Sequence, residues 1–322
     1  MRFWHIVAGI VTVGLVFAEA GTLSAQSFPL KPVRIVTAEP GGGNDLAARL
    51  IAPGMSSSLG QQVIVDNRGG ASGTIAAELV AKSAPDGYTL LLYSSAIWIL
   101  PSMRTVPYDP VRDFSTITLA ATAANILVVH PSLPVKSVKD VIALAKSRPG
   151  ELNYSSGGTG SSGHLSGALL NSMAGIDIVR VIYKGTGPAL TALIGGEVQV
   201  AFPAAGAVAS HVKSGKLRAL AVTSTKPSAL APGVPTIAAS GLPGFESVST
   251  YGIFAAAKTP AAVIARLNQE VVRVLAVADV KEQFLKAGME TVGSTPEEFS
   301  AAMKSEMSRM GKVIKDAGIR EQ

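Results

Sequence analysis

Three observations predict an α/β protein whose two lobes face a common cleft. Short apolar runs with strand character alternate with helical patterns, which is typical of sheets covered by helices. Three turns between a strand and a helix are rich in glycine, at 41–45, 68–73 and 157–163. Strands near 120–130 and 220–225 separate these units into two regions. Because ligands of open parallel sheets gather beyond the carboxyl ends of the strands, we expect loops of both lobes to line one cleft.

The first half of the chain contains the clearest alternation. The expected strands are VRIVTA (33–38), QVIVDN (62–67), TLLLYSS (89–95) and ANILVVHP (124–131). The expected helices are LAARLIAPGM (46–55) and TIAAELVAKSA (74–84). A further helix should begin at Ser137, because Asp140 three residues later completes a helix-cap pattern.

The second half repeats the pattern. The expected strands are LNYSS (152–156), IVRVIY (178–183), VQVAF (198–202) and LRALAVTS (217–224), with helices at 164–174 and after KGTGP. Thr259-Pro260 and Thr295-Pro296 should each start a helix, and Glu298 would complete a capping box with Thr295. Core packing is predicted for a stripe at helical spacing: Phe299, Met303, Met307, Met310 and Ile314.

The composition excludes several kinds of chemistry. The 322 residues contain no cysteine, so disulfides, thiolate-bound zinc and thiol nucleophiles are excluded. The net charge is +6, but lysine and arginine are spread along the chain without a basic run, and we expect no nucleic-acid partner. The histidines at 5, 130, 164 and 211 are too scattered to suggest a metal pair, so neither a metal nor a cofactor is expected.

Residues 1–25 have the layout of a cleaved secretory signal peptide. Arg2 precedes an apolar run from Ile6 to Ala18, and small residues follow it. This run of 13 residues falls short of the roughly 20 that span a bilayer. Cleavage after Ala20 or Ala25 would release the mature chain into the periplasm.

The segment SSGGTGSSGHLSG (155–167) has five glycines and six hydroxyl side chains. As a phosphate loop it lacks the lysine that should follow, and His164 stands there instead. As a dinucleotide loop its glycine spacing fits, but the next strand ends in Tyr183-Lys184 where NAD requires a carboxylate. A serine hydrolase that uses a serine beside His164 remains an alternative, although no acidic partner lies nearby in the sequence.

Binding without chemistry is the simplest interpretation of this loop. Its backbone N–H groups and the hydroxyls of Ser155, Thr159, Ser161 and Ser162 suit a small anion such as a carboxylate. A histidine at the start of a helix is more typical of a hydrogen-bonding scaffold than of a catalytic base. The segment therefore predicts an anion-binding loop.

A series of segments, in order along the whole mature chain, resembles the substrate-binding proteins of tripartite tricarboxylate transporters, the Bug family. They are KPVRIV with PGGGND and AAR (31–49), LGQQVIVDNRGGASG (59–73), APDGYTLL (84–91), VPYDPVRDF (106–114), RPGELNYSSGGTGSSGHL (148–165), YKGTGPAL (183–190), VKSGKLRALAVTS (212–224) and TPEEF (295–299). The resemblance implies the fold of type II periplasmic binding proteins, in which two crossover strands join the lobes. It also implies a carboxylate ligand, such as a di- or tricarboxylate, an acidic amino acid or an aromatic acid.

The same resemblance implies the domain limits and the partners. Lobe 1 would comprise 26–122 and 226–322, and lobe 2 would comprise 123–225. The protein would be a monomer that closes on its ligand by a hinge motion. It would deliver the ligand to a membrane transporter of one large and one small subunit. A ligand sensor for a signalling partner would use the same pocket and is the other open alternative.

The resemblance further implies that loops of both lobes hold a ligand carboxylate, partly through waters. The candidate ligand-binding residues in lobe 1 are Pro40, Gly41, Gly42, Asn44, Asp45, Ala96 and Trp98. Those in lobe 2 are Ser155, Gly158, Thr159, Gly160, Ser161, His164, Tyr183, Lys184 and Pro203.

Several of these candidates have a second interpretation. Asp45 would instead cap the following helix and pair with Arg49 one turn on, which leaves Asn44 as the better ligand contact. Lys184 would either attract the anion or stay solvated at the rim. Trp98 would either stack against a flat ligand or pack between the loop and the lobe.

Departures from the family pattern concern ligand identity. Ala38 and Glu39 stand where an aromatic residue and a proline are usual, and Pro203, Ala204 and Ala205 stand where an aspartate is usual. The smaller side chains predict a roomier and more apolar pocket. Glu39 would repel an anion unless it faces solvent or meets an amine. We therefore expect an aromatic or amphipathic carboxylate.

Overall fold

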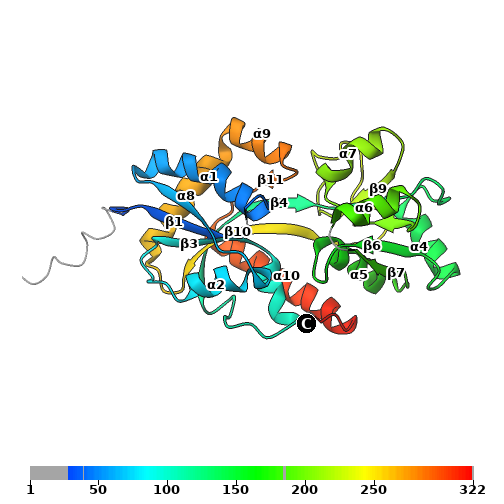
Figure 1. Cartoon of the computed structure of the whole chain (residues 1–322), viewed down its shortest axis with the longest axis horizontal. Coiled ribbons are helices and arrows are strands. Elements are labelled where there is room, and N and C mark those ends of the chain that lie inside the picture. The colour runs from blue at the N-terminus through cyan, green and yellow to red at the C-terminus, as the bar shows by residue number, and fades with distance from the viewer. Residues whose placement is uncertain (1–27, 39, 184–185, 321–322) are drawn as a thin grey trace, which may run out of the picture.

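The computed structural model describes residues 28–38, 40–183 and 186–320 and has two α/β lobes side by side (Figure 1). A six-stranded sheet forms the centre of one lobe and a five-stranded sheet the centre of the other. The two-lobed α/β architecture is therefore confirmed. The predicted signal peptide lies outside the described residues.

Lobe 1 is built on a mixed sheet with the strand order β11-β4-β10-β3-β1-β2. Its strands are β1 (Val33–Thr37), β2 (Val63–Asn67), β3 (Thr89–Ser94), β4 (Phe114–Ala124), β10 (Val248–Ala256) and β11 (Glu290–Thr291). β1 runs parallel to β2 and β3, whereas β10 pairs antiparallel with β3 and β4. Ile35 of β1 and Leu91 of β3 are fully buried, as the central strands of a sheet covered on both faces require.

Helices cover both faces of the lobe 1 sheet. They are α1 (Gly43–Leu59), α2 (Thr74–Ala81), α3 (Ala96–Ile99), α8 (Ala261–Ala276), α9 (Ala278–Lys286) and α10 (Pro296–Asp316), with short 3-10 turns η1 (Ala71–Gly73) and η2 (Leu100–Ser102). Thr295 and Glu298 form the predicted capping box at the start of α10. The predicted core stripe is also confirmed, with these residues buried and Met307 partly buried: Phe299, Met303, Met310 and Ile314.

Lobe 2 has a smaller sheet with the strand order β7-β6-β8-β5-β9. Its strands are β5 (Ile126–Val129), β6 (Asn153–Ser156), β7 (Val179–Ile182), β8 (Val200–Ala201) and β9 (Arg218–Val222). Its helices are α4 (Val138–Ser147), α5 (Ser162–Ala174), α6 (Thr186–Ile194) and α7 (Ala205–Lys213). The Ser137 hydroxyl accepts a hydrogen bond from the Asp140 N–H, so the predicted cap of α4 is confirmed.

Two antiparallel neighbours, β4 and β10, connect the lobes: β4 runs from lobe 1 toward lobe 2, and β10 returns to lobe 1 (Figure 1). Directly after β4, the Asn125 N–H donates to the Thr223 hydroxyl, the Thr223 N–H donates to the Asn125 carbonyl, and the Ser247 N–H before β10 donates to the Thr223 carbonyl. The hydroxyls of Ser166 in α5 and Ser247 are 2.8 Å apart. α10 packs against both β4 and α5. These contacts join the crossing strands to the helix that begins at the glycine-rich loop.

The segment after β9 stays beside the lobe 2 sheet beyond residue 226, and the exact domain limits remain a prediction. Ile237 donates a backbone hydrogen bond to Val222 of β9, and the Val222 N–H donates to Pro235. This part of 226–247 therefore extends the edge of the lobe 2 sheet. β10, α7 and α9 have no counterpart among the expected elements, because serine, glycine and alanine interrupt the apolar pattern of β10 and both helices are short. No helix in the described part of the chain is long and apolar enough to cross a membrane.

Candidate functional site

A cavity of about 300 Å³ lies between the lobes, and we refer to it as the interlobe cavity. Lobe 1, β10 and α10 contribute Ser72, Ser94, Ser95, Ala96, Ile99, Leu100, Met103, Ser247, Val248, Ser249, Glu306 and Met310. Lobe 2 contributes Gly158, Thr159, Gly160, Ser161, Ser162 and Leu165. The wall is thus a mixture of hydroxyl and backbone donors with apolar side chains.

The lobe 2 side of the cavity is the glycine-rich loop together with the N-terminus of α5. Ser161 is the N-cap residue, and its hydroxyl accepts a hydrogen bond from the His164 N–H at 3.4 Å. Gly160 has φ +80°, a conformation that strongly favours glycine, and a Cβ there would approach Met103 of lobe 1. The unpaired N–H groups of a helix N-terminus attract negative charge. This wall therefore suits the carboxylate end of a ligand.

His164 stabilises the glycine-rich loop through a hydrogen bond with the loop backbone. Its side chain is buried, and its Nδ1 accepts a hydrogen bond from the Gly160 N–H at 3.1 Å. Burial, and secondarily the positive charge of Arg180, lowers the pKa of His164 to about 4, so the ring is neutral at physiological pH. Among the described residues no serine hydroxyl is bonded to the ring, and His164 is not among the residues that line the interlobe cavity. The geometry matches the scaffold interpretation and not the serine–histidine pair of a hydrolase.

Arg180 of β7 stabilises the first part of the loop by hydrogen bonds. It was not among the expected site residues. Its guanidinium donates to the Ser156 hydroxyl at 2.7 Å, to the Gly157 carbonyl at 2.8 Å and to the Thr159 hydroxyl at 3.4 Å. Charged hydrogen bonds of this kind are stronger than neutral ones. An arginine inside the apolar strand IVRVIY was the available signal in the sequence.

A smaller hollow of about 170 Å³ lies within lobe 2 and shares Ser161 and Ser162 with the interlobe cavity. Ser155 and Pro203 line it, as does Thr186 at the start of α6. The Ser155 side chain is only 2% exposed, and its hydroxyl oxygen has no hydrogen-bond partner in the described structure. A buried polar atom without a partner normally requires one, so this hydroxyl is available to a bound group.

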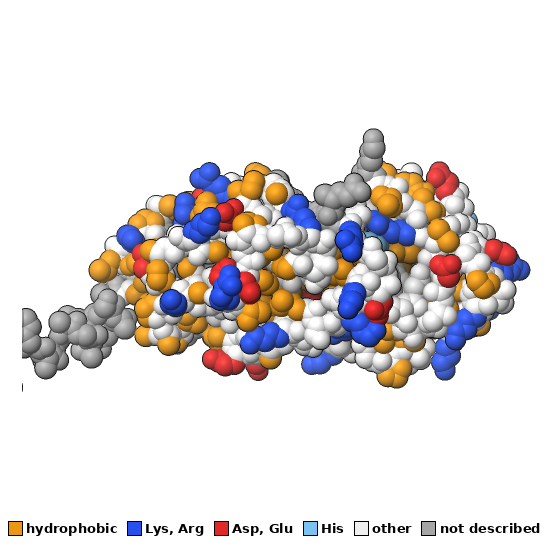
Figure 2. Space-filling model, turned by 90° about the horizontal axis from the view of Figure 1, so that it is seen from below, with side chains coloured by type: hydrophobic (Ala, Val, Ile, Leu, Met, Phe, Trp, Pro, Cys, Tyr) orange, Lys and Arg blue, Asp and Glu red, His pale blue; other side chains and the backbone are white. Residues whose placement is uncertain are grey.

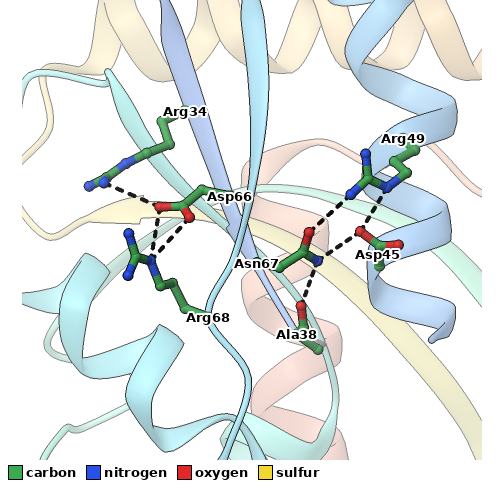
Figure 3. A network of polar contacts seen from close by, with 7 residues as sticks. All are labelled: Arg34, Ala38, Asp45, Arg49, Asp66, Asn67 and Arg68. Carbon is green, nitrogen blue, oxygen red and sulfur yellow. Dashed lines mark hydrogen bonds and ion pairs between the residues drawn. The ribbon is translucent and has the colours of Figure 1, made fainter. Parts of the chain in front are cut away.

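The PGGGND loop of lobe 1 is held by a network centred on Asp45 (Figure 3). The Asp45 carboxylate accepts hydrogen bonds from the Gly41 N–H at 2.9 Å, from Arg49 at 2.9 Å and from Asn67 at 2.8 Å. Asn67 also donates to the Ala38 carbonyl at 2.7 Å. Burial alone would raise the pKa of Asp45, but these hydrogen bonds and the Arg49 charge outweigh it and hold the pKa below its usual value.

The predicted Asp45–Arg49 pair is therefore present, but the predicted capping role needs correction. The N-cap residue of α1 is Gly42, and no side chain caps it. Asp45 instead lies in the first turn and reaches back to the Gly41 N–H, which orders the loop before the helix.

The other loop candidates do not line either hollow. Pro40, Gly41 and Gly42 are exposed, and Asn44 is partly buried with an Oδ1 atom that has no hydrogen-bond partner in the described structure. Gly43 is in close contact with Tyr251 of β10, which places the start of α1 beside a crossing strand. The ligand-binding role of this loop remains a prediction.

Ala96 lines the interlobe cavity, whereas Trp98 two residues later is fully buried. Its ring packs edge-on against Phe254 and Phe299 at centroid distances of 5.8 Å. Its Nε1–H donates to Glu306 at 3.0 Å. The packing interpretation of Trp98 is the one that matches this position.

Glu306 lines the interlobe cavity and was also not among the expected site residues. It follows Phe299 by seven residues and Met303 by three, which puts it on the buried face of α10. A carboxylate within an apolar stripe was therefore a signal that helical spacing could have revealed.

Tyr183 follows directly after β7. The Tyr183 hydroxyl donates to Glu197 at 3.4 Å, and burial, together with the Glu197 charge, raises the tyrosine pKa. Tyr183 is not among the residues that line either hollow. Lys184 and Glu39 lie outside the described residues, so their roles remain predictions.

Comparisons with known proteins agree with this architecture. A family model described as tripartite tricarboxylate transporter family receptor matches residues 47–319. BugT of Bordetella pertussis is 36% identical over 316 residues, which cover 96% of this chain and 97% of BugT. An R. palustris protein solved with adipate is 38% identical, covers 91% of this chain and 99% of its own, and has a TM-score of 0.73. MatC from Rhodopseudomonas palustris with bound malate is 31% identical, covers 89% of this chain and 100% of its own, and has a TM-score of 0.69.

Two α/β lobes with a donor-rich cavity between them define a solute-binding protein. The match over most of the chain identifies the family. The chain belongs to the receptor family of tripartite tricarboxylate transporters, as its sequence motifs predict.

Proposed function

We propose that the protein captures a small organic carboxylate between its lobes and presents it to a membrane transporter of the tripartite tricarboxylate type. The observation that carries this proposal is the interlobe cavity, in which the N-terminus of α5 faces apolar side chains of lobe 1. The first wall suits a carboxylate and the second a carbon skeleton. Nothing in this arrangement requires a bond to be made or broken, so we do not propose catalysis.

The donor wall supports an anionic ligand. Thr159, Ser161 and Ser162 present hydroxyls there, and the neutral His164 behind the loop keeps Gly160 in place. The adjoining hollow adds the unpartnered Ser155 hydroxyl. A site of oriented dipoles binds a small carboxylate without a fixed cation, which leaves the ligand free to dissociate at the transporter.

The apolar wall restricts the kind of acid. Ile99, Leu100, Met103, Leu165 and Met310 all line the cavity. Such a wall favours an acid with several methylene groups or a ring over a compact, highly hydroxylated one. The adipate bound to one relative and the malate bound to another are both dicarboxylates, which supports a dicarboxylate here.

Membership of the family supports a proposal for the localisation and the partners. We propose that the signal peptide at 1–25 is cleaved and that the mature chain acts in the periplasm as a monomer. On the face seen in Figure 2, Lys and Arg side chains are spread over both lobes, so the described residues on that face form no single basic patch. The large and small transporter subunits are the proposed partners.

A panel of acids tests the proposal. The melting temperature of the mature protein would be measured with adipate, malate, citrate, glutamate and benzoate. A saturable rise with at least one acid is expected, because a ligand that binds only the folded state stabilises it. If no acid raises the melting temperature at millimolar concentration, carboxylate capture is contradicted.

A matched pair of variants locates the binding. Ser162→Ala removes a hydroxyl that lines both hollows, and we expect affinity for the responding acid to fall about tenfold, or about 1.4 kcal/mol. Ser172→Ala makes the same change on an exposed turn of the same helix and should leave affinity unchanged. Equal effects of the two substitutions would argue against a site at the N-terminus of α5.

A further inference from the structure

Glu306 is the one charged side chain among the described residues that line the interlobe cavity. It is only partly buried as a whole, because part of its surface faces this cavity. A carboxyl group is unexpected in a site proposed for an anion, since two like charges at close range repel each other. Its surroundings indicate how both can occupy the cavity.

The contacts of Glu306 leave it without a salt bridge in the described part of the chain. Trp98 donates to Oε2 at 3.0 Å, and Ser95 adds a side-chain hydrogen bond. Arg309 on the same helix instead forms a salt bridge with Glu246, with 2.9 Å between the Arg309 Nη1 and the Glu246 Oε2. Desolvation of the carboxyl group is therefore the largest influence on the pKa of Glu306. The pKa of Glu306 rises to about 7 by burial, and Glu246 adds to the rise, although Trp98, Arg309 and Ser95 oppose it.

Within the described part of the chain, the elements that pack most closely on α10 bring no further charge to Glu306. β4, α3 and η2 contain no titratable side chain. α5 contains only His164, which accepts the Gly160 N–H and is neutral at physiological pH. A negative ligand in the cavity would consequently meet a carboxyl group that forms no salt bridge with any described residue.

Building on the proposed carboxylate capture, we propose that Glu306 is a specificity-determining residue that contacts the ligand as a neutral carboxylic acid. In this form it donates an O–H hydrogen bond to a second oxygen acceptor at the other end of the bound organic anion. Binding then takes up one proton from solution above neutral pH. The ligand class is an acid with a second carboxylate, a carbonyl or a hydroxyl. A ligand with an amine at this end would need the ionised form instead and would take up no proton.

The test measures proton uptake on binding. Adipate and malate would be titrated calorimetrically into the wild-type protein and Glu306→Gln at pH 6, 7 and 8, in two buffers of different ionisation enthalpy. For the wild type we expect affinity to fall about fivefold between pH 7 and 8, with proton uptake rising from about half a proton toward one. In Glu306→Gln, which keeps a neutral side chain of the same shape, affinity should be independent of pH. Glu297→Gln, an exposed position on the same helix, should behave like the wild type.

A pH-independent wild-type affinity, or an unchanged pH dependence in Glu306→Gln, would overturn the proposal while leaving carboxylate capture intact. Failure of every acid to bind would contradict carboxylate capture itself and the inference with it.

A second measurement needs neither a ligand nor a stable Gln variant. Because Trp98 donates directly to Glu306, its fluorescence should titrate with a midpoint near pH 7 in the free wild-type protein. Trp4, the other tryptophan, belongs to the predicted signal peptide, so a chain cleaved after Ala20 or Ala25 would contain Trp98 alone. Emission that stays constant between pH 5.5 and 8.5 would overturn the protonation of Glu306.

Discussion

The backbones of the two lobes are in close contact at Gly206 of α7 and Gly288 after α9. A Cβ atom added to Gly206 would lie 3.2 Å from the Gly288 Cα. α7 and α9 face each other across the space between the lobes (Figure 1). The lobes thus meet not only at the crossing strands and α10 but also at a contact between two glycines. Such a contact leaves no room for a larger side chain.

Bulk at this contact should separate the lobes and weaken ligand binding. Gly206→Leu introduces overlap worth about 1–3 kcal/mol, so we expect affinity for the responding acid to fall about five- to a hundredfold. Calorimetric titration measures it. Ala209→Leu, on an exposed turn of the same helix, is the control and should bind normally. Normal affinity of Gly206→Leu would exclude this contact from the ligand-bound arrangement.

The Asp45 network should contribute stability that depends on pH. Because the pKa of Asp45 is lowered in the folded protein, its contribution is complete above the pKa of the unfolded chain and is lost as pH falls through the folded pKa. Asp45→Asn should lower the free energy of unfolding by about 1–3 kcal/mol at pH 7, and the difference from wild type should shrink toward pH 3. Urea unfolding at several pH values measures this. Asp177→Asn, an exposed change, should show no such trend.

Arg180 should act as a positioning residue for the ligand loop. Arg180→Met keeps the apolar length of the side chain but removes the hydrogen bonds to Ser156, Gly157 and Thr159. We expect affinity to fall about ten- to a hundredfold because the loop must then be ordered on binding. Direct titration of the responding acid checks this, and Arg148→Met on an exposed position is the control. A large loss of stability with unchanged affinity would contradict the positioning role.

Gly252 in β10 should not tolerate a methyl group, because a Cβ there would overlap the Phe299 ring. Gly252→Ala is expected to cost about 1–3 kcal/mol in the free energy of unfolding. Phe299→Leu makes room, so the double variant should lose clearly less than the sum of the two single changes. Chemical denaturation of all four proteins gives the coupling energy. If the effects of the two substitutions on the free energy of unfolding were strictly additive, the added methyl group would be accommodated by a shift of the backbone and not of the Phe299 ring.

Local relationships were predictable from the sequence because they depend on spacing along one helix or turn. The caps at Ser137 and Thr295 and the Asp45–Arg49 pair are of this kind. The anion-binding loop was predicted for the same reason, since glycine and hydroxyl residues cluster within a few positions of one helix start.

Relationships between distant segments were not predictable in this way. Trp98 and Glu306 are 208 residues apart, and only the packing of α10 under α3 brings the indole to the carboxyl. β10 was missed because Ser249, Thr250 and Gly252 weaken its apolar pattern, although β3 and β4 hold it on both sides. The meeting of Gly206 with Gly288 depends on how the lobes are placed, which no local pattern encodes.

The crystal structure of the mature protein with the acid that raises its melting temperature most is the most direct test of the central claim. The account predicts electron density for the acid in the interlobe cavity, with one carboxylate at the Ser162 N–H or at the hydroxyls of Ser161 and Ser162. Its carbon skeleton should lie against Leu100 and Met103. Density for the acid elsewhere on the molecule, with this cavity holding only water, would contradict capture between the lobes.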